Sequence, residues 1–234
     1  MTNLIVAAAA FLLLHLVVSG TRVREAAIEA VGRGGYLGLF SLASLGLLVW
    51  LGIAYGGVWH DVGDKSYWQF TGTNEIIARS IQLVLQLIAL MFVVTGLSTR
   101  NPTTVGSEGA LENPEVVQGV LRVTRHPFLW GVAIWAAGHI MVNGDLAGLI
   151  LFGTMFVLAL FGTVSIDAKR ERALGQQWKA FAAKTSNVPF GAILSGRQKL
   201  NIGEIGFARL GSALLLWAVV LGAHPHVFGT VALP

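Results

Sequence analysis

The feature that most constrains this chain is how its few charges are distributed. Only 12% of the 234 residues are charged, against about 25% in soluble domains. Six apolar blocks carry almost none of them, namely residues 4–20, 35–59, 76–97, 128–142, 146–166 and 207–222. A helix needs about 20 residues to cross the hydrocarbon core, and within lipid its amides must be paired inside the segment. The sequence therefore predicts an all-α fold, a polytopic membrane bundle of about six transmembrane helices forming one domain over residues 1–234.

Lysine and arginine gather in three of the loops. Residues 21–34 hold three, residues 99–127 hold three and residues 167–200 hold seven of the 16 in the chain. Cytoplasmic loops carry such an excess, so we expect both termini to face away from the cytoplasm in a multi-pass protein of a bacterial inner membrane. The basic isoelectric point of about 9.8 follows from this asymmetry. It indicates membrane lipids as partners and gives no reason to expect nucleic acid.

The first apolar block is expected to be a retained helix rather than a signal peptide. No basic residue precedes it, and Arg22 and Arg24 follow it directly, which is the wrong charge order for a cleaved leader. Farther along, Asn113, Pro114 and Glu115 have the pattern of a helix start, with an N-cap, a first-turn proline and an early acid. We expect the helix that follows to lie at the cytoplasmic interface before the Arg-His-Pro sequence.

Residues 167–185 are predicted to form a second helix that does not span the membrane. At 100° per residue one face is apolar and the opposite face is basic. The apolar face comprises Leu174, Trp178 and Phe181, and a polar triplet on the same side comprises Asp167, Arg170 and Glu171. Either the helix lies on the surface with its acids in the first turn, or the triplet points at a site between this helix and the bundle.

Polar side chains inside the apolar blocks are candidates for function because they are costly in lipid. The first block contains His15 and the fourth contains His139. Residues four apart share one stripe of the fourth block, and a second polar stripe runs along the third. The first stripe is Gly131, Trp135, His139 and Asn143, and the second is Arg79, Gln82 and Gln86.

Two imidazoles on facing helices fit only some kinds of metal site. A structural zinc site needs four ligands, whereas two histidines suffice as the axial pair of a haem, and bundles build cofactor sites from inward residues. The chain has no cysteine, which excludes thiolate ligands. The alternative is that each histidine is a hydrogen-bonded structural group. His60, His224 and His226 fall at the predicted non-cytoplasmic ends, where an imidazole is easily solvated.

Several motifs together resemble a known family. They are His15 to Gly20, "GRGGY" (32–36), "TRHPFLWG" (124–131), "WAAGHIMVNGD" (135–145) and the terminal "HPHVFGTVALP". Nearly the whole chain is similar to the NnrU family of membrane proteins, first associated with denitrification and nitric oxide metabolism. The Arg-His-Pro segment, the later histidine and the tail "KTSNVPFGAI" (184–193) also resemble the 15-cis-zeta-carotene isomerases, which belong to the same superfamily.

The isomerase resemblance implies haem b held by His15 and His139. It implies cis–trans isomerisation of a polyene such as 9,15,9'-tri-cis-zeta-carotene, a lipophilic substrate, with no net redox change. Ala136 stands where such isomerases carry a cysteine, so ligand exchange with a thiol is not expected. At about 1.5 Å per residue the two histidines lie at unequal depths, and His126 is the substitute ligand.

Other cofactor contacts are expected around the two ligands. Arg125 and Arg79 are candidate partners for the haem propionates, although each can equally anchor a helix end. Trp135 lies one turn before His139 on the same stripe. Catalytic residues beyond the ligands are not identified by the resemblance.

A second resemblance gives an alternative function. "RHPFLWG" and residues 171–190 are similar to motifs of the membrane isoprenylcysteine carboxyl methyltransferases, which implies binding of S-adenosylmethionine near the Arg-His-Pro turn. Leu129 occupies the place of the family's tyrosine, which counts against methyl transfer. A third possibility is a haem-binding or nitric oxide-related accessory protein of denitrification.

Overall fold

A computed structural model describes the protein at all residues except 20, 60, 62 and 105. The described part is helical, apart from loops and one isolated β-bridge between Ser66 and Asp145. The elements in order are α1 (Thr2–Leu13) with its π-helical continuation η1 (Leu14–Val18), α2 (Val23–Gly56), α3 (Thr73–Ser98), the 3-10 helix η2 (Glu108–Glu112), α4 (Val120–Val123), α5 (Pro127–Val142), α6 (Leu146–Leu174), α7 (Gln176–Lys184), α8 (Gly191–Leu194), α9 (Ile202–Ile205) and α10 (Phe207–Phe228). The all-α prediction is confirmed.

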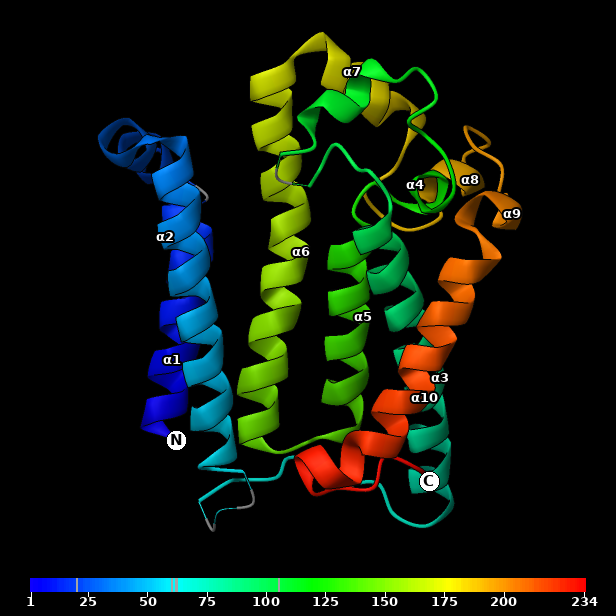
Figure 1. Cartoon of the computed structure of the whole chain (residues 1–234). Coiled ribbons are helices and arrows are strands. Elements are labelled where there is room, and N and C mark those ends of the chain that lie inside the picture. The colour runs from blue at the N-terminus through cyan, green and yellow to red at the C-terminus, as the bar shows by residue number, and fades with distance from the viewer. Residues whose placement is uncertain (20, 60, 62, 105) are drawn as a thin grey trace.

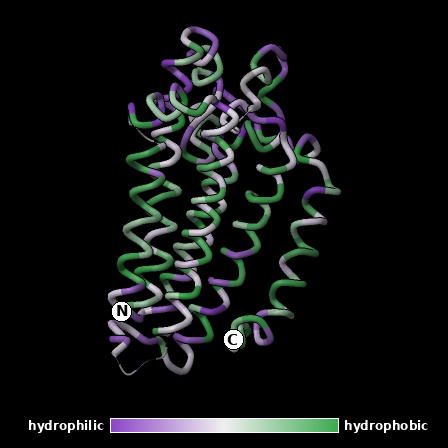
Figure 2. Tube along the Cα trace, turned by 60° about the vertical axis from the view of Figure 1, so that its left-hand side comes forward, coloured by the Kyte–Doolittle hydropathy of each residue, from purple (hydrophilic) through white to green (hydrophobic). Residues whose placement is uncertain are grey.

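Each of the six predicted apolar blocks is helical over most of its described residues, but the helices differ in length. Within the described residues α2, α3, α6 and α10 are long and apolar enough to cross a membrane, whereas Thr2–Val18 and α5 are shorter apolar helices. Figure 2 shows apolar residues along the middle of the bundle and polar residues at its two ends. The protein is a helical membrane bundle with four helices of spanning length and two shorter ones packed beside them.

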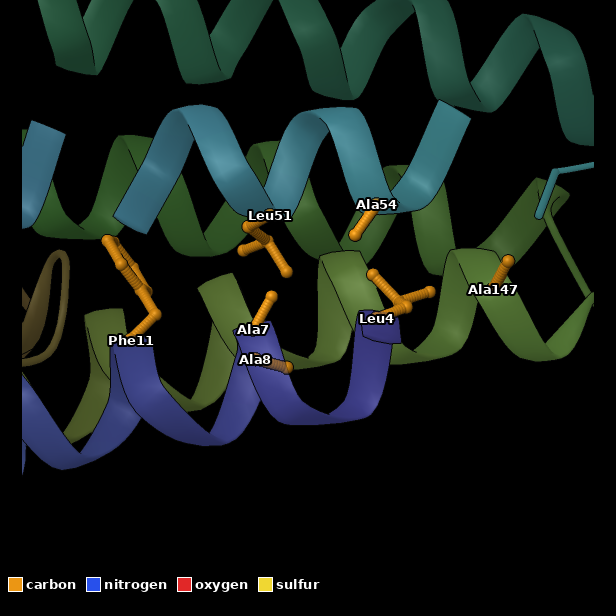
Figure 3. Close-up of a cluster of buried hydrophobic side chains, with 7 residues drawn as sticks. All are labelled: Leu4, Ala7, Ala8, Phe11, Leu51, Ala54 and Ala147. Atoms are coloured by element: carbon orange, nitrogen blue, oxygen red, sulfur yellow. The ribbon is translucent and has the colours of Figure 1, made fainter. Parts of the chain in front are cut away.

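Helix α1 packs into the angle between α2 and α6 through mostly small side chains (Figure 3). Leu4 and Leu51 have no exposed surface. The buried cluster consists of Leu4, Ala7, Ala8, Phe11, Leu51, Ala54 and Ala147. Because lipid tails are as apolar as leucine, helices in a membrane associate through close van der Waals packing at small residues. This cluster therefore fixes the position of α1.

Helices α3 and α5 approach each other closely at glycines of α5. A Cβ atom at Gly131 would lie 2.8 Å from the backbone oxygen of Ala89 on α3. A Cβ at Gly138 would collide with the side-chain amides of Gln82 and Gln86. These glycines are thus required for the backbone approach, and the predicted stripe of α5 partly serves to pack the helices.

Both chain termini lie at one end of the bundle (Figure 1). The short helices α4, α7, α8 and α9 gather at the opposite end, where α2 also begins, so the three basic loops share that end. The predicted topology is confirmed in this respect. The side of the membrane that each end faces stays a prediction.

The predicted separate helix over residues 167–185 is wrong in its first half. Helix α6 continues without interruption to Leu174 and ends only where Gly175 adopts a φ of 52°. No glycine or proline stands between Asp167 and Leu174 to stop it earlier. At 1.5 Å per residue the 29 residues of α6 extend about 44 Å, well beyond a hydrocarbon core of about 30 Å. The helix is therefore long enough for its last two turns, which carry its charged residues, to extend past the hydrocarbon core.

The predicted helix start at Asn113 is also wrong. The Asn113 side chain accepts a hydrogen bond from the backbone N–H of Glu115 at 3.0 Å, which closes a local turn instead of capping a helix. Gly119 then adopts a φ of 56°, and only the single turn α4 follows it. Helix α2, by contrast, begins earlier than the apolar block and passes through a kink at Gly32 (φ 74°).

An ion pair joins α4 to α9. Arg122 Nε and Nη2 donate to the two oxygens of Glu204 at 2.7 and 2.9 Å, and the backbone N–H of Gly119 donates to the same carboxylate at 3.0 Å. These donors lower the pKa of Glu204 from 4.5 to about 2. The charged carboxylate is therefore the form that stabilises this end of the protein.

We expect Glu204→Ala to lower the free energy of unfolding by about 1 kcal/mol, since the pair is partly exposed. Because its pKa is lower in the folded state, the contribution of Glu204 is present above pH 4.5 and is lost as the pH falls toward 2. Chemical denaturation in detergent at several pH values measures this. The exposed acid Glu115 is the matched control, and an equal loss in Glu115→Ala would contradict the assignment.

Candidate functional site

A buried polar cluster lies where the Arg-His-Pro turn meets α6. Arg125 Nε donates to both carboxylate oxygens of Asp167, at 2.9 and 3.0 Å, and His126 Nε2 donates to Oδ1 at 2.7 Å. Asn187 Nδ2 adds a hydrogen bond of 3.2 Å to Oδ2. The His126 side chain is fully buried, and the side chains of Arg125 and Asp167 are only 13% and 19% exposed. One carboxylate therefore neutralises a buried cation and orients a buried imidazole.

The segment after α7 docks on this turn and completes the cluster. The backbone N–H of Arg125 donates to the oxygen of Ser186 at 2.9 Å. The oxygen of Asn187 accepts from Trp130 Nε1 at 2.8 Å and from the Thr124 hydroxyl. Sequence reasoning did not identify Asn187, and the only signal for it was its place in the tail motif shared with the isomerases.

His126 is held in one tautomer at the start of α5. It precedes Pro127, the first residue of α5, and has a non-helical backbone with φ −120°, as expected for a residue before proline. Burial lowers the pKa of His126 against the opposing pull of Asp167, so the ring is neutral with its proton on Nε2. Nδ1 is buried and finds no donor among the described residues. His126 also lines the cavity of about 450 Å³ that lies beside the cluster.

The three polar residues Asp167, Arg170 and Glu171 do not all point the same way. Some face the bundle and others lie on the surface. Asp167 points into the cluster, and Arg170 Nη2 donates to the backbone oxygen of Thr104 at 2.8 Å. Glu171 is exposed, with Lys179 at 3.9 Å. Beside the cluster lies a cavity of about 450 Å³ between the end of α3, the loop that follows it, Pro127–Leu129 and Ile166. Asp167 therefore faces the interior of the bundle, as the site hypothesis requires, whereas Glu171 lies on the surface.

His15 lies in η1 and both of its ring nitrogens are engaged. Nδ1 donates to the backbone oxygen of Phe11 at 2.8 Å, and Nε2 accepts from the Ser44 hydroxyl at 3.1 Å. Its ring also contacts the rings of Phe11 and Phe40. Such a histidine is satisfied by the protein alone.

His139 has one nitrogen engaged and one open. Nδ1 donates to the backbone oxygen of Trp135 at 2.9 Å, and no described residue pairs with Nε2. The ring stacks on Phe152 of α6 with centroids 4.5 Å apart and an angle of 20°, and it contacts Trp135 at 5.0 Å. A fixed ring with a free Nε2 has the form of a metal-ligating histidine, in which the other nitrogen bonds a carbonyl.

The structure does not bring His15 and His139 together. Ser44 of α2 contacts His15, whereas Tyr55 of the same helix contacts Phe152, the residue on which His139 stacks. Ser44 and Tyr55 are eleven residues apart in α2, so the two histidines lie at levels that differ by about 16 Å along the bundle. The unequal depths expected from the sequence are present in the fold.

A different histidine lies near His139. His224, near the end of α10, lies within electrostatic range of His139. Its Nδ1 bonds the backbone oxygen of Thr230 at 2.9 Å, and the ends of α10 and α5 lie at the same end of the bundle (Figure 1). His226 is exposed, and His60 lies outside the described residues.

Arg79 is occupied by protein groups at the end of the bundle that holds the termini. It pairs with Glu75 at 2.8 Å and donates to the backbone oxygens of Val231 and Leu233 at 3.0 and 3.4 Å. Arg125 is likewise occupied by Asp167. Both arginines therefore anchor chain segments here, and Trp135 is the one predicted cofactor contact that adjoins His139.

Residues 3–232 match the model of a protein family described as NnrU protein, which is nearly the whole chain. The chain belongs to the NnrU family. The resemblance inferred from the motifs is thus confirmed, and the Arg-His-Pro turn of this NnrU protein is the one whose contacts are described above.

Two named relatives are similar to this NnrU protein at modest identity. The 15-cis-zeta-carotene isomerase of Zea mays chloroplasts is 29% identical over 184 residues, covering 76% of this chain and 47% of the relative. The Arabidopsis thaliana chloroplast protein of the same name is 25% identical over 214 residues, covering 88% and 56%. The chain thus spans about half the length of these relatives. No solved structure matches it significantly.

Proposed function

We propose that this protein is a membrane-embedded isomerase that acts on a cis double bond of a carotenoid such as 9,15,9'-tri-cis-zeta-carotene. The observation that carries the proposal is the similarity of most of the chain to two plant 15-cis-zeta-carotene isomerases. The apolar helices of spanning length fit a site that a lipophilic polyene reaches from the bilayer. Isomerisation rotates the molecule about one double bond, so the product has the same atoms and the same number of electrons as the substrate.

We also propose haem b as the cofactor, with His139 as one ligand. The chemistry of His139 fits, since its Nε2 is free and its ring is fixed by Trp135 and Phe152. The pair of His15 and His139 does not fit one iron, because metal–nitrogen bonds are about 2 Å long and the two levels differ by about 16 Å. His224 lies within electrostatic range of His139. When bound, the haem would supply an iron that assists bond rotation without net redox change.

The ligand proposal predicts different spectra for two histidine variants. Purified protein expressed with ample haem should show a Soret band and sharp α and β bands after reduction with dithionite. We expect His139→Ala to lose these bands and His15→Ala to keep them, because both nitrogens of His15 already have protein partners. A folded but colourless wild-type protein would contradict the haem proposal, and loss in His15→Ala alone would contradict the ligand assignment.

The isomerase proposal is tested by co-expression with phytoene desaturase in cells grown in the dark. Tri-cis-zeta-carotene should disappear in favour of its di-cis isomer when the protein is present, and it should persist with His139→Ala. The exposed His226 is the matched control, and His226→Ala should retain the conversion. An unchanged tri-cis pool despite haem loading would contradict the isomerase and favour a haem-binding or nitric oxide-related accessory protein.

S-adenosylmethionine-dependent methyl transfer is the second candidate. The observation that favours it is the cavity of about 450 Å³ beside the Arg-His-Pro turn. The segment that contains Asn187 docks on the same turn. Calorimetric titration of the detergent-solubilised protein with S-adenosylmethionine separates the two functions. The isomerase proposal predicts no heat of binding, whereas saturable binding would favour the methyltransferase.

A further inference from the structure

We propose that the protein binds a phosphate-bearing headgroup, that of an anionic phospholipid, in the cavity between the end of α3, the loop over residues 113–119 and the start of α10. This cavity has a volume of about 200 Å³, and two arginines line it, Arg100 just after α3 and Arg209 in α10. The site is separate from the proposed isomerase site, so it goes beyond that function.

The two arginines form a local excess of positive charge. Arg209 donates only to backbone oxygens, those of Ile205 and Ser98 at 3.2 and 3.3 Å. These contacts fix its position and leave its charge without a carboxylate partner among the described residues. Arg100 is exposed, and no described residue pairs with it either. A planar guanidinium matches a phosphate group through paired hydrogen bonds.

The acidic residues that line the cavity do not cancel this charge. Glu204 is already neutralised by Arg122. Glu115 is exposed on the surface loop, where a carboxylate is well solvated and can turn away. With Arg100 and Arg209 counted, the cavity keeps a net positive charge, which favours an anion over a zwitterion.

The position of the cavity points to a lipid as the source of the phosphate. Arg100 follows the last residue of α3 by two positions, and Arg209 is the third residue of α10, so both lie where a spanning helix meets the headgroup region. The apolar residues next to them are widely exposed, with Leu97 at 69% and Phe207 at 77%. Acyl chains can run along these surfaces while the headgroup enters the cavity. Basic pockets between membrane helices bind acidic headgroups in this way.

The experiment is native mass spectrometry of the full chain titrated with dimyristoylphosphatidylglycerol, and with dimyristoylphosphatidylcholine as the zwitterionic comparison. We expect the anionic lipid to bind at least about tenfold more tightly, and this preference to fall as salt is added. Arg100→Gln with Arg209→Gln should remove most of the preference. Arg172→Gln with Lys184→Gln removes two exposed cations from the same end of the protein and should leave the preference unchanged.

The single variant Arg100→Gln should fold normally, because no described residue pairs with Arg100. We expect it to weaken binding of the anionic lipid about threefold. Inorganic phosphate is the second ligand. If phosphate alone raises the melting temperature in an Arg100-dependent way, the site takes free phosphate as well as the lipid. Equal binding of the two lipids, or equal losses in the two double variants, would overturn the proposal in favour of non-specific attraction to a basic surface.

Discussion

Replacing Asp167 by alanine should lower the free energy of unfolding by about 3–5 kcal/mol. The carboxylate is the shared acceptor for Arg125 and His126, which are almost completely buried. Removing one partner of a buried pair leaves the other charge without compensation, which is far more costly than losing a pair on the surface. Denaturant-induced unfolding in detergent, followed by tryptophan fluorescence, measures the loss.

Glu171, one turn farther along α6, is the matched control for Asp167. Its side chain is 55% exposed, and its carboxylate lies 3.9 Å from Lys179 Nζ. We expect Glu171→Ala to change the free energy of unfolding by less than about 0.5 kcal/mol. Similar effects of the two substitutions would show that the polar cluster does not hold the Arg-His-Pro turn to α6.

Gly131→Ala is expected to destabilise the protein by about 1–3 kcal/mol through overpacking. The added Cβ would lie 2.7 Å from Val93 Cγ2, 2.8 Å from the backbone oxygen of Ala89 and 2.9 Å from the backbone nitrogen of Val93. Backbone atoms cannot move aside as a flexible side chain can, so α3 and α5 must separate. The melting temperature of the purified variant reports the effect.

Gly153 provides the comparison for the same chemical change. It lies inside α6, and a Cβ there would meet no atom within 4 Å. Gly153→Ala should be neutral or stabilise the protein by up to about 1 kcal/mol, because alanine is the better helix former. Equal losses at both positions would indicate a general intolerance of α5 and α6 to substitution and would contradict the close-approach account.

The bundle could be predicted because its signal is compositional. Blocks without charge mark the helices whatever their neighbours, and the basic loops place both termini at one end. The end of α6 could not be predicted from hydropathy, since five of the eight residues from Asp167 to Leu174 are charged and yet continue the helix to Gly175. A helix ends where the backbone conformation changes, whereas an apolar block ends where the chain leaves the hydrocarbon core. The two ends therefore need not coincide.

The histidines show the same limit at the level of the site. Sequence spacing indicated that His15 and His139 face the bundle, and it also indicated their unequal depth. It could not show that Ser44, 29 residues away, satisfies His15, or that the end of α10 brings His224 near His139. Asn187 and Asp167 likewise meet only through tertiary packing. Contacts between residues distant in the sequence leave no local sequence pattern. The candidate residues could therefore be identified from the sequence, whereas their contacts could not.

The central claim, isomerisation of a carotenoid, is tested most directly with purified protein in liposomes loaded with 9,15,9'-tri-cis-zeta-carotene and kept in the dark. Chromatography should show loss of the tri-cis form and an equal gain of the di-cis form, with no change in mass. His226→Ala should behave like the wild type and His139→Ala should not convert the substrate. An unchanged tri-cis pool with folded, haem-loaded protein would contradict the account.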